Sequence, residues 1–182
     1  MKIEAFRITL SFLYALAVDL VGRAGGLAVL WNEPSSVEFL KYGQCFIELL
    51  IQDQRRQFEW RALGVYISFV PSIRESQFRL LEQQLLAIIE PLIVLGDFNS
   101  TTHSSENVGG VPWTVSQHID FLEFINNVKL IDLGFASLKR TWSNKRRGAH
   151  HMAASGSDHL AFLLDAYRRW PKPRPVFRFD HR

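Results

Sequence analysis

The sequence predicts a mixed fold of the α/β or α+β class, and three observations support this. Strand-like segments fill the N-terminal part of the chain, and segments with helical periodicity follow them. Apolar residues make up 47% and charged residues 21% of the chain, as in an ordinary globular domain. The 182 residues are enough for one domain with its own core. We therefore expect one domain over residues 1–165 and a basic, Pro/Arg-rich tail over residues 166–182.

The first apolar run covers residues 8–18 and is too short to cross a bilayer as a helix. Lys2 and Arg7 precede it, as basic residues precede the apolar part of a secretory signal, but no clear small-residue cleavage site follows. We favour a core element of the domain at this position and expect no membrane partner.

Four strand-like segments come next, rich in β-branched, aromatic and aliphatic residues and separated by turn-forming residues. They cover residues 26–31, 37–42, 44–52 and 58–69. Cys45, the single cysteine, lies in the third segment, so an intrachain disulfide is excluded. Its apolar neighbours predict a buried and unreactive thiol.

Residues 72–90 then change to a helical period, with Ser72 as the expected N-cap and Pro91 as the stop. The predicted core face carries Phe78, Leu81, Leu85, Ile88 and Ile89, and the predicted polar face carries Arg74, Glu75, Glu82 and Gln83.

Residues 91–95 form a run too apolar for a solvent-exposed face, which predicts a strand at the centre of a covered sheet. A second amphipathic helix is predicted over residues 116–129, and short strands over residues 130–135 and 159–165. The expected core residues of that helix are Ile119, Leu122, Phe124, Ile125 and Val128.

Two polar motifs stand at the ends of apolar runs. Gly96-Asp97-Phe98-Asn99 closes the run 91–95, and Ser157-Asp158-His159 opens another run about sixty residues later. Open α/β sheets collect their catalytic groups at strand ends. Each motif alone is compatible with a simple turn or a strand cap. The functional prediction therefore depends on the two motifs occurring together in this order.

Together these motifs resemble the endonuclease/exonuclease/phosphatase superfamily, whose members cleave phosphoester bonds with a divalent metal. Residues 22–31, 130–135, 141–144 and 174–179 are further similar to the endonuclease domain of plant-type LINE (non-LTR) retrotransposons. The resemblance extends over roughly residues 7–182. It implies a four-layered α/β sandwich of two packed sheets flanked by helices, Mg²⁺ or Mn²⁺ as the cofactor and DNA as the substrate.

The resemblance also implies roles for individual residues. Asp97 would activate or orient the attacking water, and Asn99 would hydrogen-bond the phosphate. Asp158 would belong to the metal side of the site, while His159 would contact the phosphate and stabilise developing charge. Tyr66 aligns with a tyrosine at the edge of the active site in many relatives, although an aromatic residue in a strand is more often part of the core.

The chain departs from this family in two places. No residue matches the Asn and the metal-binding Glu that family members carry before the first apolar run. Residues 149–155 replace a longer segment that includes the Asp that orients the catalytic histidine. The resemblance therefore implies a domain truncated at the N-terminus and internally deleted, with impaired activity.

The charge of the chain is unevenly distributed. Residues 139–182 hold 11 Lys/Arg against 3 Asp/Glu, which suits a polyanionic partner such as nucleic acid. We expect DNA contacts from Arg140, Lys145, Arg146 and Arg147; the alternative is a merely solvated tail. Trp113 and Trp142 could stack on bases, although core or rim packing is the commoner use of a tryptophan.

Three functions remain open from the sequence. The first is a metal-dependent DNA endonuclease, and the second is a catalytically dead retroelement remnant that still binds nucleic acid. The third is a phosphatase for sugar or lipid phosphates, which the LINE-like segments and the basic tail disfavour. The sequence does not fix a location; an intracellular one, including the nucleus, fits a protein that acts on DNA, and no protein partner is indicated.

Overall fold

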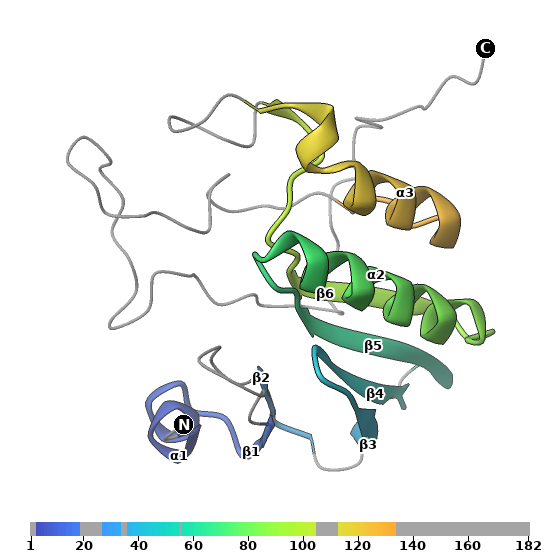
Figure 1. Cartoon of the computed structure of the whole chain (residues 1–182). Coiled ribbons are helices and arrows are strands. Elements are labelled where there is room, and N and C mark those ends of the chain that lie inside the picture. Colours follow the sequence, from blue (N-terminus) through green and yellow to red (C-terminus); the bar gives the residue numbers. More distant parts are fainter. Residues whose placement is uncertain (1–2, 19–26, 34–35, 55, 105–112, 134–182) are drawn as a thin grey trace. The chain divides into compact units, whose positions relative to one another are not determined.

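The computed structural model describes residues 3–18, 27–33, 36–54, 56–104 and 113–133. The chain divides into two units, Met1–Lys129 and Leu130–Arg182, and every helix and strand named below lies in the first (Figure 1). The predicted strand 159–165 and the tail 166–182 lie outside the described residues, so the predicted domain boundary stays a prediction. Among the described helices, none is long and apolar enough to cross a membrane.

The first unit contains two sheets and three α-helices in its described part. In chain order the elements are α1 (Ile3–Thr9), β1 (Tyr14–Val18), β2 (Leu27–Trp31), β3 (Val37–Tyr42), β4 (Phe46–Asp53), β5 (Phe58–Tyr66), α2 (Pro71–Leu86), β6 (Leu92–Asp97), a 3-10 turn η3 (Val115–Gln117) and α3 (Ile119–Val128). Strands β1 and β2 form an antiparallel pair. The second sheet has the order β3-β4-β5-β6, and its last pair, β5 and β6, is parallel. The predicted mixed α/β class with two sheets is confirmed.

The two sheets share one apolar core. Ile47 and Leu49 of β4 pair in register with Gly64 and Ala62 of β5, so their side chains lie on one face of the sheet. The apolar residues of β1 and β2 pack against this face. They are Leu16, Val18, Leu27 and Val29. The later part of the apolar run 8–18 is therefore a core strand, as predicted, although Ile8, at the end of α1, is 63% exposed.

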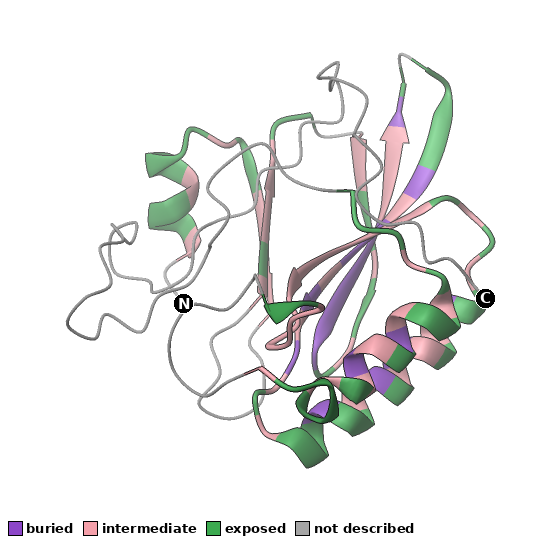
Figure 2. Ribbon diagram, turned by 90° about the horizontal axis from the view of Figure 1, so that it is seen from above, coloured by how far each residue is buried: buried purple, intermediate pink, exposed green. Residues whose placement is uncertain are grey.

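Helix α2 lies across the other face of the four-stranded sheet, and α3 packs on α2 (Figure 1). Phe78 of α2 stacks on Phe121 and Phe124 of α3 with ring centroids 5.5 and 5.0 Å apart. Figure 2 shows the buried residues on the central strands and on the helix sides that face them. The helix period placed Phe78 and Phe124 in the core correctly, because both are almost fully buried.

Several predicted details of the helices are wrong. Helix α2 begins at Pro71 after Val70, without a side-chain cap, because proline at the first helical position has its φ preset and has no N–H group to satisfy. It ends at Leu86, so Ile89 lies beyond the helix and is 95% exposed. Arg74, predicted on the polar face, is buried because it pairs with Asp120 of α3.

In α3, Phe121 is buried whereas Ile119, the first residue of the helix, is half exposed. Leu122, Ile125 and Val128 are only partly buried.

Two strand predictions also need correction. Strand β6 lies at the edge of the four-stranded sheet within the described residues, not at its centre, and all its residues are partly buried. Its apolar sequence matches its packing, because Ile93 and Leu95 join the core between the sheets. Residues 130–133, the described part of the predicted strand 130–135, do not form a strand, and Ile131 is 82% exposed. A short apolar run alone does not define a strand.

Cys45 has the buried thiol that the sequence predicts. It is fully buried just before β4, and burial raises the pKa of its thiol to about 11, because the apolar surroundings disfavour the thiolate. The carbonyl of Cys45 accepts a hydrogen bond from the backbone N–H of Tyr66, at a distance of 2.9 Å. The inert cysteine thus lies beside the last residue of β5, where the candidate site begins.

Candidate active site

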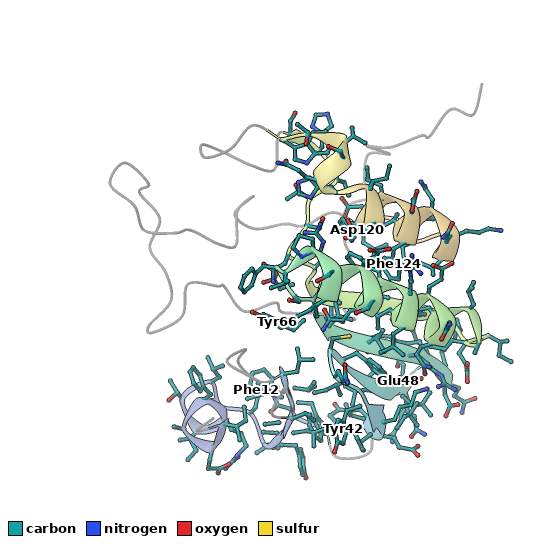
Figure 3. The ribbon with its side chains drawn as sticks, in the orientation of Figure 1. Phe12, Tyr42, Glu48, Tyr66, Asp120 and Phe124 are labelled. Atoms are coloured by element: carbon teal, nitrogen blue, oxygen red, sulfur yellow. The ribbon has the colours of Figure 1, made fainter. Side chains whose placement is uncertain are left out.

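The predicted site residues Tyr66 and Asp97 lie side by side at the carboxyl ends of β5 and β6. They are register partners in the parallel pair, so their side chains leave the same face of the sheet. The same pairing sets Ala62 beside Ile93, which places this face on the side of the core between the two sheets. Figure 3 shows Tyr66 at the end of β5, near the start of α2. Tyr66 and Asp97 are therefore neighbours at this end of the sheet, and their roles in a site stay predictions.

Gly96 allows β6 to approach β5 closely enough for this pairing. Its φ angle is +140°, a conformation that residues with a side chain rarely adopt. A Cβ atom at this position would lie 1.9 Å from the carbonyl oxygen of Val65 on β5, so no side chain fits. The glycine before Asp97 therefore fixes the position of the carboxylate at the strand end.

A tight turn after β6 fixes Asp97 and Asn99 relative to each other. The backbone N–H of Asn99 donates to Oδ1 of Asp97 at 2.8 Å, and Nδ2 of Asn99 donates to the carbonyl of Ile67 at 2.7 Å. The N–H of Ile67 in turn donates to the carbonyl of Asp97 at 2.8 Å. Asn99 has a φ angle of 45°, which asparagine tolerates better than most residues. We refer to residues 97–99 as the Asp97 turn.

The residues that follow the turn are held by an imidazole that the sequence did not indicate. Nδ1 of His118 lies 2.8 Å from Oγ of Ser100 and accepts from the N–H of Thr101 at 3.3 Å. Because Nδ1 accepts from a backbone N–H, the neutral ring carries its proton on Nε2. Trp113 stacks on His118 with an interplanar angle of 8° and donates its indole N–H to Oγ1 of Thr101 at 3.0 Å.

An ion pair between helices holds His118 in place. Arg74 of α2 donates to Oδ2 of Asp120 at 2.7 Å and to the carbonyl of Gln117 at 2.8 Å. His118 lies between these two partners in sequence, at the start of α3. Figure 3 shows Asp120 at this end of the helix. The contact of His118 with Ser100 thus depends on the docking of α3 against α2.

The remaining predicted site residues lie outside the described residues. These are Asp158, His159, Arg140, Lys145, Arg146 and Arg147. Among the residues that the structure describes, no group of three or more His, Cys, Asp or Glu side chains is placed to hold a metal ion. Glu48 is fully buried, but it pairs with Arg61 and has Lys41 at 3.3 Å. It is therefore an element of the fold rather than a ligand at the Asp97 turn.

The donor chemistry of the turn fits a hard divalent cation. The carboxylate of Asp97 and the amide of Asn99 offer oxygen atoms, and Mg²⁺ prefers oxygen ligands. Magnesium sites in phosphate-handling proteins use one or two carboxylates and complete the shell with water and substrate oxygens. Two such oxygen donors lie at the Asp97 turn, and the predicted metal ligand Asp158 lies outside the described residues.

No protein-family model and no curated protein matches the sequence. Among solved structures, the chain is similar to ANGEL2, a 2',3'-cyclic phosphatase solved in complex with adenosine-2',3'-vanadate. The similarity is weak, with a TM-score of 0.39 and 14% sequence identity. It covers 57% of this chain and 37% of ANGEL2, so the chain spans well under half of that protein. The assignment to plant-type LINE endonucleases stays a prediction from the sequence motifs.

Proposed function

We propose that the chain carries a site of the endonuclease/exonuclease/phosphatase type for divalent-metal-dependent hydrolysis of phosphodiester bonds in DNA. The observation that supports this most strongly is the convergence of Tyr66, Asp97 and Asn99 at the carboxyl ends of paired parallel strands. Loops at this end of a sheet are where α/β proteins bind ligands. The LINE-like segments of the sequence favour DNA over other phosphate esters.

In this proposal each residue acts on a different part of the reaction. The carboxylate of Asp97, held by the N–H of Asn99, orients a water molecule and accepts its proton. The amide of Asn99 donates to a phosphate oxygen. His159 would stabilise negative charge on the phosphate, and Asp158 would hold Mg²⁺ or Mn²⁺ together with water. The bound cation supplies charge neutralisation in the transition state.

The proposed DNA contacts come from the basic segment 139–182. Arg140, Lys145, Arg146 and Arg147 would neutralise backbone phosphates and bring DNA to the Asp97 turn. Such contacts bind any sequence and weaken as salt rises. These contacts favour a long polyanionic substrate over a single sugar phosphate or lipid phosphate.

We expect slow catalysis, because the sequence has no counterpart for the Asp that orients the histidine in this family. Without that partner, the tautomer and direction of the His159 ring are not fixed. The basic segment does not depend on that Asp. A protein that binds DNA without cleaving it is therefore the second candidate function.

The test is cleavage of end-labelled DNA with the full chain in excess, in Mg²⁺ and in EDTA. The Asp97→Asn variant keeps an oxygen that can accept the Asn99 N–H, so the turn is retained while the base is lost. We expect it to cleave about 10- to 100-fold more slowly, less than the full effect of a catalytic base because the site is already impaired. In a multiple-turnover plasmid assay we expect little difference between Asp97→Asn and the unmodified chain, because impaired activity should leave nicking by both near the background, so the test depends on the single-turnover rates.

The matched control is Glu123→Gln on the exposed side of α3, which removes the same charge away from the site. It should cleave at the unmodified rate. Equal rates for Asp97→Asn and the unmodified chain, with DNA binding retained, would exclude the hydrolase and leave the binding protein.

A further inference from the structure

An aromatic cluster lies directly after the Asp97 turn. It consists of His103, Trp113 and His118. The rings of Trp113 and His118 are nearly parallel with centroids 5.5 Å apart, and His103 lies 6.4 Å from Trp113 at an angle of 29°. The cluster joins residues from the loop after β6 and from the start of α3, so it forms only when the unit is folded.

Hydrogen bonds tie this cluster to the candidate site. The indole N–H of Trp113 donates to Thr101, and Ser100 and Thr101 both contact Nδ1 of His118. Ser100 and Thr101 follow Asn99 without a gap. The four residue-to-residue steps from Asp97 to Thr101 span at most about 14 Å even when the chain is extended. A phosphate at the turn and a base at the cluster could therefore belong to neighbouring nucleotides of one strand.

The cluster is only partly shielded from solvent. Trp113 and His118 are only partly buried, and His103 is exposed. Because the polar N–H of Trp113 is already bonded to Thr101, the orientation of the ring is fixed before any ligand arrives. Its ring contacts are imidazoles, which is unlike the Phe-rich packing between α2 and α3. A pre-oriented, partly exposed indole is suited to stacking on a nucleobase.

We propose that this aromatic cluster is a subsite for an unpaired nucleobase, which stacks on Trp113 after the exposed ring of His103 moves aside. The inference rests on the proposed phosphodiester site, because the neighbouring phosphate is the one bound at the Asp97 turn. It adds that the ligand is a strand with an accessible base, such as single-stranded or opened DNA. A sugar or lipid phosphate would leave the cluster unused.

The experiment compares two ligands with the same number of phosphates. One is a short single strand of thymidine nucleotides, and the other is the same strand built from abasic tetrahydrofuran units. Binding to the full chain is measured by fluorescence anisotropy in EDTA, so that no cleavage occurs. Stacking of one base predicts roughly 5- to 100-fold tighter binding of the strand that carries bases.

The preference should disappear in Trp113→Leu and persist in Trp113→Phe, which keeps an aromatic face. The matched control is Trp31→Leu, because Trp31 is also partly buried and also stacks on an aromatic ring, that of Tyr14, 5.7 Å away. Trp31→Leu should keep the preference. If Trp113→Leu does not fold, Thr101→Val takes its place, because it frees the indole and should reduce the preference.

Either of two outcomes would contradict the proposed nucleobase subsite. One is equal affinity of the unmodified chain for both strands, and the other is an undiminished base preference in folded Trp113→Leu. Neither depends on catalysis. Cleavage without a base preference would support the hydrolase and contradict the subsite. A Trp113-dependent base preference without cleavage would support the subsite and contradict the hydrolase. The two proposals can therefore fail separately.

Discussion

Replacing Arg61 with methionine is expected to lower the free energy of unfolding by about 3–5 kcal/mol. The reason is Glu48, whose side chain is fully buried beneath α2 and pairs with the guanidinium of Arg61. The same guanidinium donates to Glu90 at 2.7 Å, and these two hydrogen bonds raise the pKa of Arg61. Without Arg61, the charged partner that the described part of the chain leaves to the Glu48 carboxylate is Lys41, at 3.3 Å and half exposed. A buried charge that has lost a partner is among the most costly defects in a folded protein.

The measurement is urea unfolding followed by circular dichroism. Arg79→Met is the matched control, because Arg79 forms an exposed ion pair with Glu75 and should cost less than about 1 kcal/mol. A double variant, Glu48→Leu with Arg61→Met, removes both charges and should recover most of the loss. Equal effects of Arg61→Met and Arg79→Met would show that the Glu48 charge is not buried as described.

The second large effect is expected from Gly96→Ala. The new Cβ would meet the carbonyl oxygen of Val65 at 1.9 Å and would occupy a φ angle of +140°. The strained conformation and the loss of pairing between β5 and β6 should together cost about 3–5 kcal/mol. Because Asp97 follows directly, the variant should also lose any Asp97-dependent cleavage.

Gly64→Ala is the control for this prediction, in the adjacent strand of the same sheet. A Cβ atom at Gly64 would have its nearest neighbour, the carbonyl oxygen of Ile47, at 4.0 Å, so the methyl group fits. We expect a change within about 1 kcal/mol, of either sign. A Gly96→Ala protein that unfolds at the same urea concentration as Gly64→Ala would contradict the close approach of β6 to β5.

Local sequence patterns were sufficient for much of the fold. The strand and helix patterns of the sequence predicted β2 to β5, α2 and α3 within a few residues of their observed positions. The predictions were wrong where a contact between residues far apart in the sequence determines the burial of a side chain or the position of a strand. Arg74 is buried only because Asp120, 46 residues away, pairs with it. The edge position of β6 likewise depends on which strands pair, which no local pattern contains.

The same distinction applies to the candidate site. Asp97 and Asn99 were predicted because their motif closes an apolar run and, with Ser157-Asp158-His159, resembles that of a known superfamily, and a local turn joins the two residues. The partners of the next residues, His118 and Trp113, lie 18 and 12 residues further along the chain from Ser100 and Thr101. Neither residue has a motif of its own, and only the docking of α3 brings them to Ser100 and Thr101.

We propose that Asp97 and Asn99 act together on one phosphodiester, and a double-mutant cycle on the single-turnover cleavage rate tests this. Asp97→Asn removes the base, and Asn99→Gly removes the amide while tolerating the positive φ angle of 45° at this position. If both act on one transition state, the double variant should be slowed little more than the slower single variant. Rate losses that multiply in the double variant, or cleavage that neither change affects, would contradict the account.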